Sequence, residues 1–246
     1  TKTITSKPKT KVEEHHHDHH DESCITKYIF SEDHKVIAKQ FLITGIFWAI
    51  IGGAMSSLFR IQLGFPDMDL TALSPIIGNW LTPQGKIDPE VYLALITMHG
   101  TIMVFFVLTA GLSGTFSNFL IPLQIGARDM ASGFLNMLSY WFFFLSSIVM
   151  FISIFVEGGP ASGGWTIYPP LSALPQAVSG SGMGMTLWLV SMSLFIVSAL
   201  LGALNYITTV INLRTEGMTF FRMPLTIWAF FVTAILGVLS FPVLLS

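Results

Sequence analysis

YLALITMHGTIMVFFVLTAGLSGTFSNFL, residues Tyr92 to Leu120, is the stretch that decides the fold of this chain. It has no Asp, Glu, Lys or Arg, and its single histidine is His99. About 20 apolar residues in an α-helix are enough to cross a hydrocarbon core about 30 Å thick. We therefore predict that this stretch is a membrane-spanning helix.

Four further apolar stretches are near or above the length that a spanning helix needs. They run from Phe41 to Phe59, Phe134 to Val156, Met185 to Val210 and Leu225 to Leu245. A transmembrane β-barrel would need short segments of alternating apolar and polar residues, whereas these stretches are continuously apolar. The sequence predicts an all-α membrane protein, a polytopic transmembrane helix bundle whose five spans form a membrane domain over residues 40–246.

The composition agrees with this fold class and excludes several functions. Of the 246 residues, 52% are hydrophobic and 11% are charged, so lipid is the expected solvent. A formal net charge of −2 provides no basic surface for nucleic acid. The single cysteine, Cys24, permits neither an intrachain disulfide nor a metal cluster held by several thiolates.

The first 39 residues are polar and have no hydrophobic periodicity, so we expect a mobile, aqueous N-terminal tail. The tail contains the run HHHDHH at positions 15–20. Such a run can collect metal ions, or it can be a solvated segment or an added tag. We favour the second interpretation, because composition alone is weak support for a metal site.

The cations indicate how the chain is oriented. On one side lie Lys27, Lys35, Lys39, Arg128, Arg214 and Arg222. On the other side, the predicted loops contain only Arg60 and Lys86. Since cytoplasmic loops are enriched in Lys and Arg, we expect the N-terminus to be cytoplasmic.

His99 is the one histidine inside a predicted span. An imidazole in hydrocarbon needs a hydrogen-bond partner, a metal or water, so it is either packed against a neighbouring polar group or a ligand. Small and aromatic residues around it would let a flat porphyrin approach the helix, with His99 as an axial ligand of heme iron. These residues are Gly100, Phe105, Phe106, Gly111 and Gly114.

Asp129 lies in the loop between the second and third stretches, beside Arg128. The two can form a solvated charge pair of little energetic value. Alternatively, Asp129 collects protons for a wire of water, amides and hydroxyls. The candidate polar steps are Ser139, Ser198 and Asn205, and Asn118 and Asn136 lie before and after Asp129 in the sequence.

Three residues on the opposite side have two interpretations each. Trp165 and Tyr168, in a loop rich in turn formers, are interfacial anchors or parts of a folded binding loop. Arg60 extends its cation to the interface, or it binds a polar substituent of a heme.

Several segments together resemble subunit I of the heme–copper cytochrome c oxidases. They are MHGTIMVFFVLTAGLSGTFSNFLIPLQIGARDM, LNMLSYW, GGWTIYPPLS and GALNYITTVINLR. The resemblance runs from about Arg60 to Ser246, and the spacing matches, such as the 30 positions from His99 to Asp129.

The resemblance implies a role for each candidate residue. His99 would be an axial ligand of the low-spin, a-type heme, and Arg60 would bond the formyl group of that heme. Asp129 would be the entrance of a proton pathway continued by Asn118, Asn136, Ser139, Ser198 and Asn205. Trp165 would lie against the propionates of a second, high-spin heme, with Tyr168 in the same loop.

For the whole protein, the resemblance implies a cytochrome c oxidase, a proton-translocating enzyme of the bacterial inner membrane. Electrons would pass from cytochrome c or a similar donor to O2 through the low-spin heme and a heme–copper centre. Subunits II and III would be partners alongside membrane lipid, and the resemblance leaves room for a respiratory supercomplex. Family members have about twelve spans and bind copper after the fifth, so this chain would be the N-terminal part of the subunit.

The sequence departs from the family pattern at three places. Ala131-Ser132-Gly133-Phe134 follows the aspartate where relatives have Phe-Pro-Arg. Phe195 and Ala199 replace serines that line the proton path in many relatives. Gln62 replaces a glutamate that helps to bind a calcium or sodium ion, so we predict no ion site there.

Two interpretations from other classes remain. A lone histidine and broken helices are also compatible with a solute or ion transporter. The second interpretation is a membrane anchor that binds heme but has no catalytic activity. A reduced-minus-oxidised spectrum separates the transporter, which would have no heme bands, from an oxidase.

Overall fold

The computed structural model describes residues 28–77, 81–156, 158–174 and 182–245. The chain divides into two compact units, Thr1–Ser31 and Glu32–Ser246, and the second contains every helix discussed below. The histidine run at 15–20 and most of the expected polar tail lie outside the described residues.

The described part of the chain is helical and has no strands, which confirms the predicted all-α fold. Its helices are α2 (His34–Gly64), η1 (Thr71–Leu73), α3 (Ser74–Ile77), α4 (Pro89–Thr101), η3 (Ile102–Ser113), α5 (Gly114–Ile125), α6 (Gly133–Ser153), α7 (Met183–Asn212), η4 (Phe220–Arg222) and α8 (Leu225–Leu245). Five helical segments are long and apolar enough to cross a membrane, with α4, η3 and α5 joined into one span. This chain is therefore a multi-pass membrane protein.

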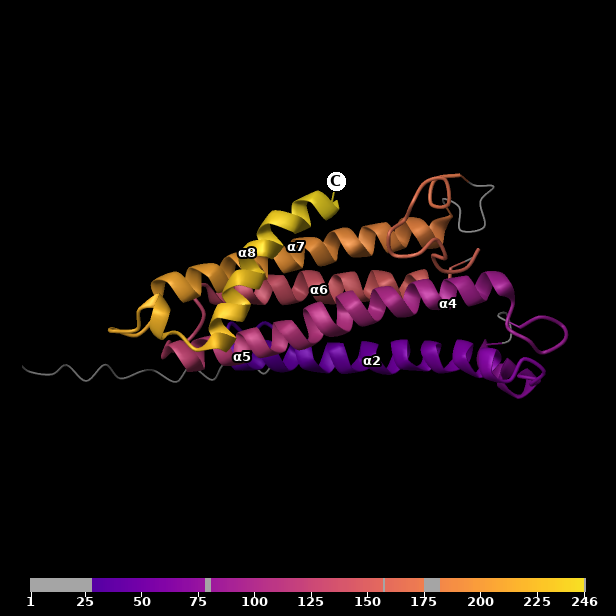
Figure 1. The fold of residues 1–246 in the computed structure, drawn as a ribbon, viewed down its shortest axis with the longest axis horizontal. Coiled ribbons are helices and arrows are strands. Elements are labelled where there is room, and N and C mark those ends of the chain that lie inside the picture. The colour runs from indigo at the N-terminus through magenta and orange to yellow at the C-terminus, as the bar shows by residue number, and fades with distance from the viewer. Residues whose placement is uncertain (1–27, 78–80, 157, 175–181, 246) are drawn as a thin grey trace, which may run out of the picture. The chain divides into compact units, whose positions relative to one another are not determined.

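Figure 1 shows α2, α4, α6 and α7 running side by side, with α8 crossing α7. α2 packs against α4, η3 and α5, while α6 packs mainly against α7. α8 contributes only three buried side chains, Ile227, Phe231 and Ala234. Most of its apolar surface therefore faces away from the other described helices.

The first spanning helix begins at His34, ahead of the apolar stretch that starts at Phe41. Asp33 caps it: the Asp33 side chain accepts hydrogen bonds from the backbone N–H of Lys35 (2.7 Å) and Val36 (3.2 Å). These bonds satisfy N–H groups that have no partner in the first helical turn. Because of this cap the helix begins at His34, so the polar residues that precede Phe41 belong to the helix.

The second span is interrupted by a π-helix, η3, which the sequence did not predict. The Thr109 hydroxyl donates to the carbonyl of Val104, five residues earlier, at 2.8 Å. A π segment has a wider turn than an α-helix and often occurs near functional sites. Here it lies between His99 and Asn118, so it sets the rotation of one relative to the other.

Small residues in this span serve helix packing. Gly111 approaches the backbone of Gly45 so closely that a Cβ on Gly45 would lie 2.7 Å from the Cα of Gly111. A Cβ on Gly114 would lie 2.9 Å from the Phe41 ring, and Phe106 is fully buried. These three residues were expected to accommodate a porphyrin, but they contact α2 and other core residues.

Buried hydroxyl and indole groups cross-link the spans. The Trp48 indole N–H donates to Ser147 Oγ at 2.8 Å. Ser146 and Ser191 exchange hydrogen bonds, each hydroxyl donating to the other's carbonyl at 2.8 Å. In lipid, such polar contacts and close backbone packing are what hold helices together.

The loops after α5 and α7 lie at the same end of the bundle. The Thr215 backbone N–H donates to the Ile125 carbonyl at 3.0 Å, and the Ala131 N–H donates to Thr209 Oγ1 at 2.9 Å. This arrangement agrees with the clustering of cations on one side in the sequence.

The Gln62 side chain ties two parts of the opposite-side loop. Its Oε1 accepts from the Ile87 N–H at 2.9 Å, and its Nε2 donates to the Pro66 carbonyl at 3.3 Å. An amide has both a donor and acceptors, so it can make both contacts. Gln62 thereby holds this loop through direct hydrogen bonds.

Candidate functional site

His99 is on α4, and its ring is oriented by the backbone of α2. His99 Nδ1 lies 2.8 Å from the carbonyl oxygen of Gly52. A carbonyl only accepts, so Nδ1 must carry the proton and Nε2 keeps its lone pair. A histidine held in this tautomer by a carbonyl is the arrangement found in metal-ligating histidines.

The surroundings of His99 are apolar on one side and open on another. The Phe59 ring makes an edge contact with the imidazole, with ring centroids 5.6 Å apart. His99 is partly exposed, and a Cβ built on the adjacent Gly100 would meet no atom within 4 Å, so the other described residues leave this part of α4 partly uncovered. A free nitrogen lone pair, an aromatic wall and adjacent space fit a heme as the ligand.

Arg60 also lies near the Phe59 ring. Its guanidinium carbon is 6.0 Å from the Phe59 ring centroid, and its Nε donates to Ser56 Oγ at 3.0 Å. The side chain is exposed. Arg60 therefore lies close to the His99 site and keeps donors for a polar group.

The loop with Trp165 and Tyr168 is attached to the same span as His99. The Gly164 N–H donates to Thr97 Oγ1 at 3.0 Å, and the Trp165 ring lies 6.0 Å from that of Phe105. Trp165 and Tyr168 are 53% and 69% exposed. The structure thus brings Trp165 next to the π segment, while Tyr168 has no described contact with His99.

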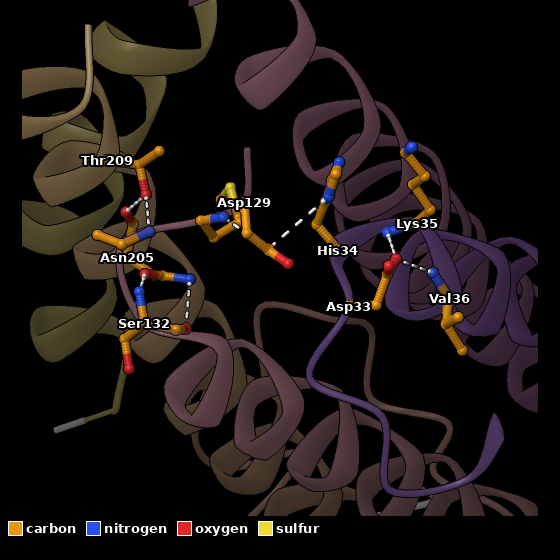
Figure 2. A network of polar contacts seen from close by, with 10 residues as sticks. Asp33, His34, Lys35, Val36, Asp129, Ser132, Asn205 and Thr209 are labelled. Atoms are coloured by element: carbon orange, nitrogen blue, oxygen red, sulfur yellow. Dashed lines mark hydrogen bonds and ion pairs between the residues drawn. The ribbon is translucent and has the colours of Figure 1, made fainter. Parts of the chain in front are cut away.

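At the other end of the bundle, two side chains of α7 hold the loop that contains Asp129 (Figure 2). Asn205 Nδ2 donates to the Ser132 carbonyl at 3.1 Å, and Asn205 Oδ1 accepts from the Ser132 N–H at 3.0 Å. Thr209 accepts from Ala131. The Ser132 hydroxyl also caps α6, accepting from the Leu135 N–H at 3.2 Å. These contacts hold the backbone of the loop in place, although its sequence departs from the family pattern.

His34, at the start of α2, lies beside Asp129. Its Nδ1 is 3.7 Å from Asp129 Oδ1, as Figure 2 shows. The His34 side chain is 3% exposed and the Asp129 side chain is 40% exposed. Sequence reasoning missed this contact, because the two residues are far apart in the chain and His34 precedes the first apolar stretch.

Two amides expected on the proton path are fully buried. Asn118 Nδ2 donates to the Gly114 carbonyl (2.8 Å) and to the Tyr206 hydroxyl (3.2 Å). Asn118 Oδ1 and both amide atoms of Asn136 have no hydrogen-bond partner among the described residues. Since buried polar groups are normally bonded to protein or ordered water, these atoms favour a hydrated interior.

The two expected serines line one cavity. It has a volume of about 270 Å³ and is bounded by side chains of α2, η3, α5, α6, α7 and α8. Ser198 Oγ donates to the Ser139 carbonyl at 2.6 Å, and Ser139 Oγ donates to the Asn136 carbonyl at 2.8 Å. Both hydroxyl protons are engaged, so toward the cavity these serines act as acceptors.

The candidate residues therefore form two groups. One group, around His99, includes Arg60 and Gly52. The other, between Asp129 and the cavity, has polar side chains from four spans and contains Asn118, Asn136, Ser139, Ser198, Asn205, Tyr206 and His34. Within the described residues, no cluster of three or more His, Cys, Asp or Glu could hold a metal ion.

This is a multi-pass helical membrane protein with an oriented histidine in one span and a polar interior opening at the other end. The family model described as cytochrome C and quinol oxidase polypeptide I matches residues 36–246. The chain therefore belongs to this oxidase family, which confirms the resemblance of its segments.

Individual relatives agree. The chain is 43% identical over 226 residues to the alternative cytochrome c oxidase subunit 1 of Bradyrhizobium diazoefficiens, covering 92% of this chain and 36% of the relative. It is 39% identical over 220 residues to the cytochrome c oxidase subunit 1 of Synechocystis sp., covering 89% of this chain and 35% of the relative. The heme-copper oxidase subunit I+III of Aeropyrum pernix is 35% identical over 221 residues, which are 90% of this chain and 25% of the relative. The chain spans about a third of the length of its bacterial relatives.

Proposed function

We propose that this chain is the N-terminal part of the catalytic subunit of a proton-pumping terminal oxidase, and that His99 ligates its low-spin heme. The observation that supports this most directly is the 2.8 Å contact between His99 Nδ1 and the Gly52 carbonyl. It leaves Nε2 as the free ligand atom and fixes the orientation of the ring. Family membership favours this function over solute transport.

In this proposal the heme, when bound, supplies reversible one-electron transfer. The chain would hold it: His99 would provide a ligand nitrogen, Phe59 an apolar wall, and Arg60 hydrogen bonds to a polar substituent. A fixed guanidinium is suited to this because its charge does not titrate and its donors are planar. Trp165 and Tyr168 are proposed to contact a second heme near the outer loop.

Asp129 is proposed as the proton entrance. Its carboxylate is partly exposed, so it exchanges protons with the aqueous phase, and the polar side chains above it extend into the bundle. Asn136 and Asn118 present buried amide atoms that are available to water. Asn205, whose amide atoms are bonded to Ser132, positions the loop, while Ser139 and Ser198 accept hydrogen bonds from water in the cavity.

The complete enzyme is proposed to reduce O2 with electrons from cytochrome c or a similar donor, with a second heme and copper held by other parts of the subunit. Subunits II and III would be its partners in a bacterial inner membrane, with the N-terminus of this chain in the cytoplasm. The large apolar surface of α8 is available to lipid or to further helices.

The heme assignment is tested with His99→Ala in the full-length enzyme, measured by a reduced-minus-oxidised spectrum. We expect loss of the low-spin a-type signal. His34→Asn is the matched control, since His34 lies at the opposite group of residues and should leave the spectrum unchanged. A low-spin signal that persists in His99→Ala would overturn the assignment.

The entrance is tested with Asp129→Asn, which is nearly isosteric and cannot bind a proton at that position. We expect slowed turnover and loss of proton pumping in vesicles, with an unchanged heme spectrum. Arg128→Gln, beside it and exposed, is the control. Proton uptake at the wild-type rate in Asp129→Asn would refute the entrance.

A further inference from the structure

Tyr206 carries a hydroxyl group that the pathway predicted from the sequence did not include. It follows Asn205 on α7, is partly buried, and lines the same cavity as Ser139 and Ser198. Its neighbours on the cavity wall of α7 include Phe195, Ala199 and Ala203, which have no hydroxyl. Tyr206 therefore adds a polar group to a largely apolar wall.

The direction of its hydrogen bond is determined by Asn118. One proton of the Asn118 amide goes to the Gly114 carbonyl and the other to Tyr206 Oη at 3.2 Å. An amide nitrogen has only donors, so Tyr206 Oη is the acceptor. The bond with Asn118 does not use the hydroxyl proton of Tyr206, and Ser117, which lines the same cavity, is a second side-chain neighbour of this hydroxyl.

Ser139 and Tyr206 both lie next to Gly202. A Cβ built on Gly202 would be 3.7 Å from Tyr206 Oη and 4.0 Å from Ser139 Oγ. The Ser139 hydroxyl proton is already donated to the Asn136 carbonyl, so its oxygen acts as an acceptor. A donor and an acceptor therefore border the same small space, which exists because residue 202 has no side chain.

Water fits between them. The cavity of about 270 Å³ has room for several molecules, since one occupies about 30 Å³ in the liquid. A water there would accept a hydrogen bond from the Tyr206 hydroxyl and donate one to Ser139 Oγ. Such a chain has one direction of polarity, from the Asn118 amide to the serines.

We propose that Tyr206 is a positioning residue of the proton path, which orients cavity water between Asn118 and Ser139. The hydroxyl forms no covalent bond and keeps its proton over a full cycle. This inference rests on the proposed function of Asp129 as entrance. It adds a residue of α7 that orients water in the part of the proton path that follows the buried amides of Asn118 and Asn136.

The test measures proton uptake with a pH-sensitive dye after the fully reduced, full-length enzyme is mixed with O2. Tyr206→Phe removes the hydroxyl and keeps the ring. We expect uptake to slow by about two- to tenfold, the factor that corresponds to one lost hydrogen bond. The heme spectrum should be unchanged, and Tyr206→Phe with Ala199→Ser, which returns a hydroxyl to the cavity wall, should recover part of the rate.

Tyr140→Phe is the matched control. Tyr140 is buried, and its hydroxyl also has a side-chain partner, Thr44 at 3.2 Å, but Tyr140 does not line this cavity. It should leave the uptake rate at the wild-type value. Equal slowing in both variants would indicate a general packing effect and overturn the proposal.

Gly202→Ala provides a second variant that does not depend on how well Tyr206→Phe assembles. The added methyl group makes only ordinary contacts with Tyr206 and Ser139, but it occupies the space between their hydroxyls. Slowed uptake with an intact spectrum supports the proposal. If Tyr206→Phe and Gly202→Ala both match wild type while Asp129→Asn is slow, Tyr206 has no role and the entrance stands. If Asp129→Asn also matches wild type, the proposed entrance itself is wrong.

Discussion

His34 Nδ1 lies 3.7 Å from Asp129 Oδ1, so the start of the first span contacts the loop between the second and third. His34 is buried and Asp129 is partly exposed, and both nitrogens of His34 lack a hydrogen-bond partner among the described residues. The contact therefore places a buried imidazole beside a carboxylate that water reaches.

Replacing His34 tests this contact. In His34→Asn, the imidazole beside Asp129 is lost, and we expect proton uptake to slow by about two- to fivefold, because a polar contact with one exposed partner contributes up to about 1 kcal/mol. Lys35→Gln is the control, since Lys35 is exposed. Stopped-flow uptake measurements at low and high salt check this, and equal rates in His34→Asn and wild type would contradict it.

Asn205 is predicted to hold the loop in place. Asn205→Ala leaves the N–H and carbonyl of Ser132 without these partners, and a buried group left unpaired costs about 1–3 kcal/mol. We expect faster hydrogen exchange at residues 129–133, measured by mass spectrometry. Thr208→Ala, on the exposed face of the same helix, should leave exchange unchanged. Unchanged exchange in Asn205→Ala would show that Thr209 alone holds the loop.

The close approach of α2 and η3 depends on glycine. Gly45→Ala would place a methyl group 2.7 Å from the Gly111 Cα, which is backbone and can yield only if the helices separate. Overpacking of this kind costs about 1–3 kcal/mol, so we expect a lower midpoint in detergent unfolding. Gly53→Ala, on the same helix with no atom within 4 Å of its Cβ, should behave as wild type.

The outer loop is predicted to weaken in acid through Asp69. Hydrogen bonds from the Thr71 hydroxyl and then from the Thr71 backbone N–H hold the pKa of Asp69 below its usual value. A group whose pKa is lowered by folding stabilises the folded state above its unfolded pKa, and this contribution is lost as pH falls through the folded pKa. Protease sensitivity of residues 66–77 in vesicles should therefore rise below about pH 4. Asp69→Asn should remove this pH dependence.

Much of the architecture could be predicted from the sequence alone. The spans follow from continuous apolar stretches, because in lipid every backbone polar group must be satisfied within the segment and a helix does this locally. His99 and Asp129 could be identified as candidates for the same reason, since an ionisable side chain in or next to such a stretch is unusual. The family motifs then assigned each a role.

Only the tertiary structure decided which groups meet. The Gly52 carbonyl that orients His99, the ring of His34 beside Asp129, and the hydroxyl of Tyr206 on Asn118 all come from other helices. Hydropathy does not encode the rotation of one helix against another. That rotation is set by close contacts such as Gly45 with Gly111 and by the wide π turn. Residues that the sequence did not indicate as functional, such as Gly52 and Tyr206, therefore prove to border the two candidate sites.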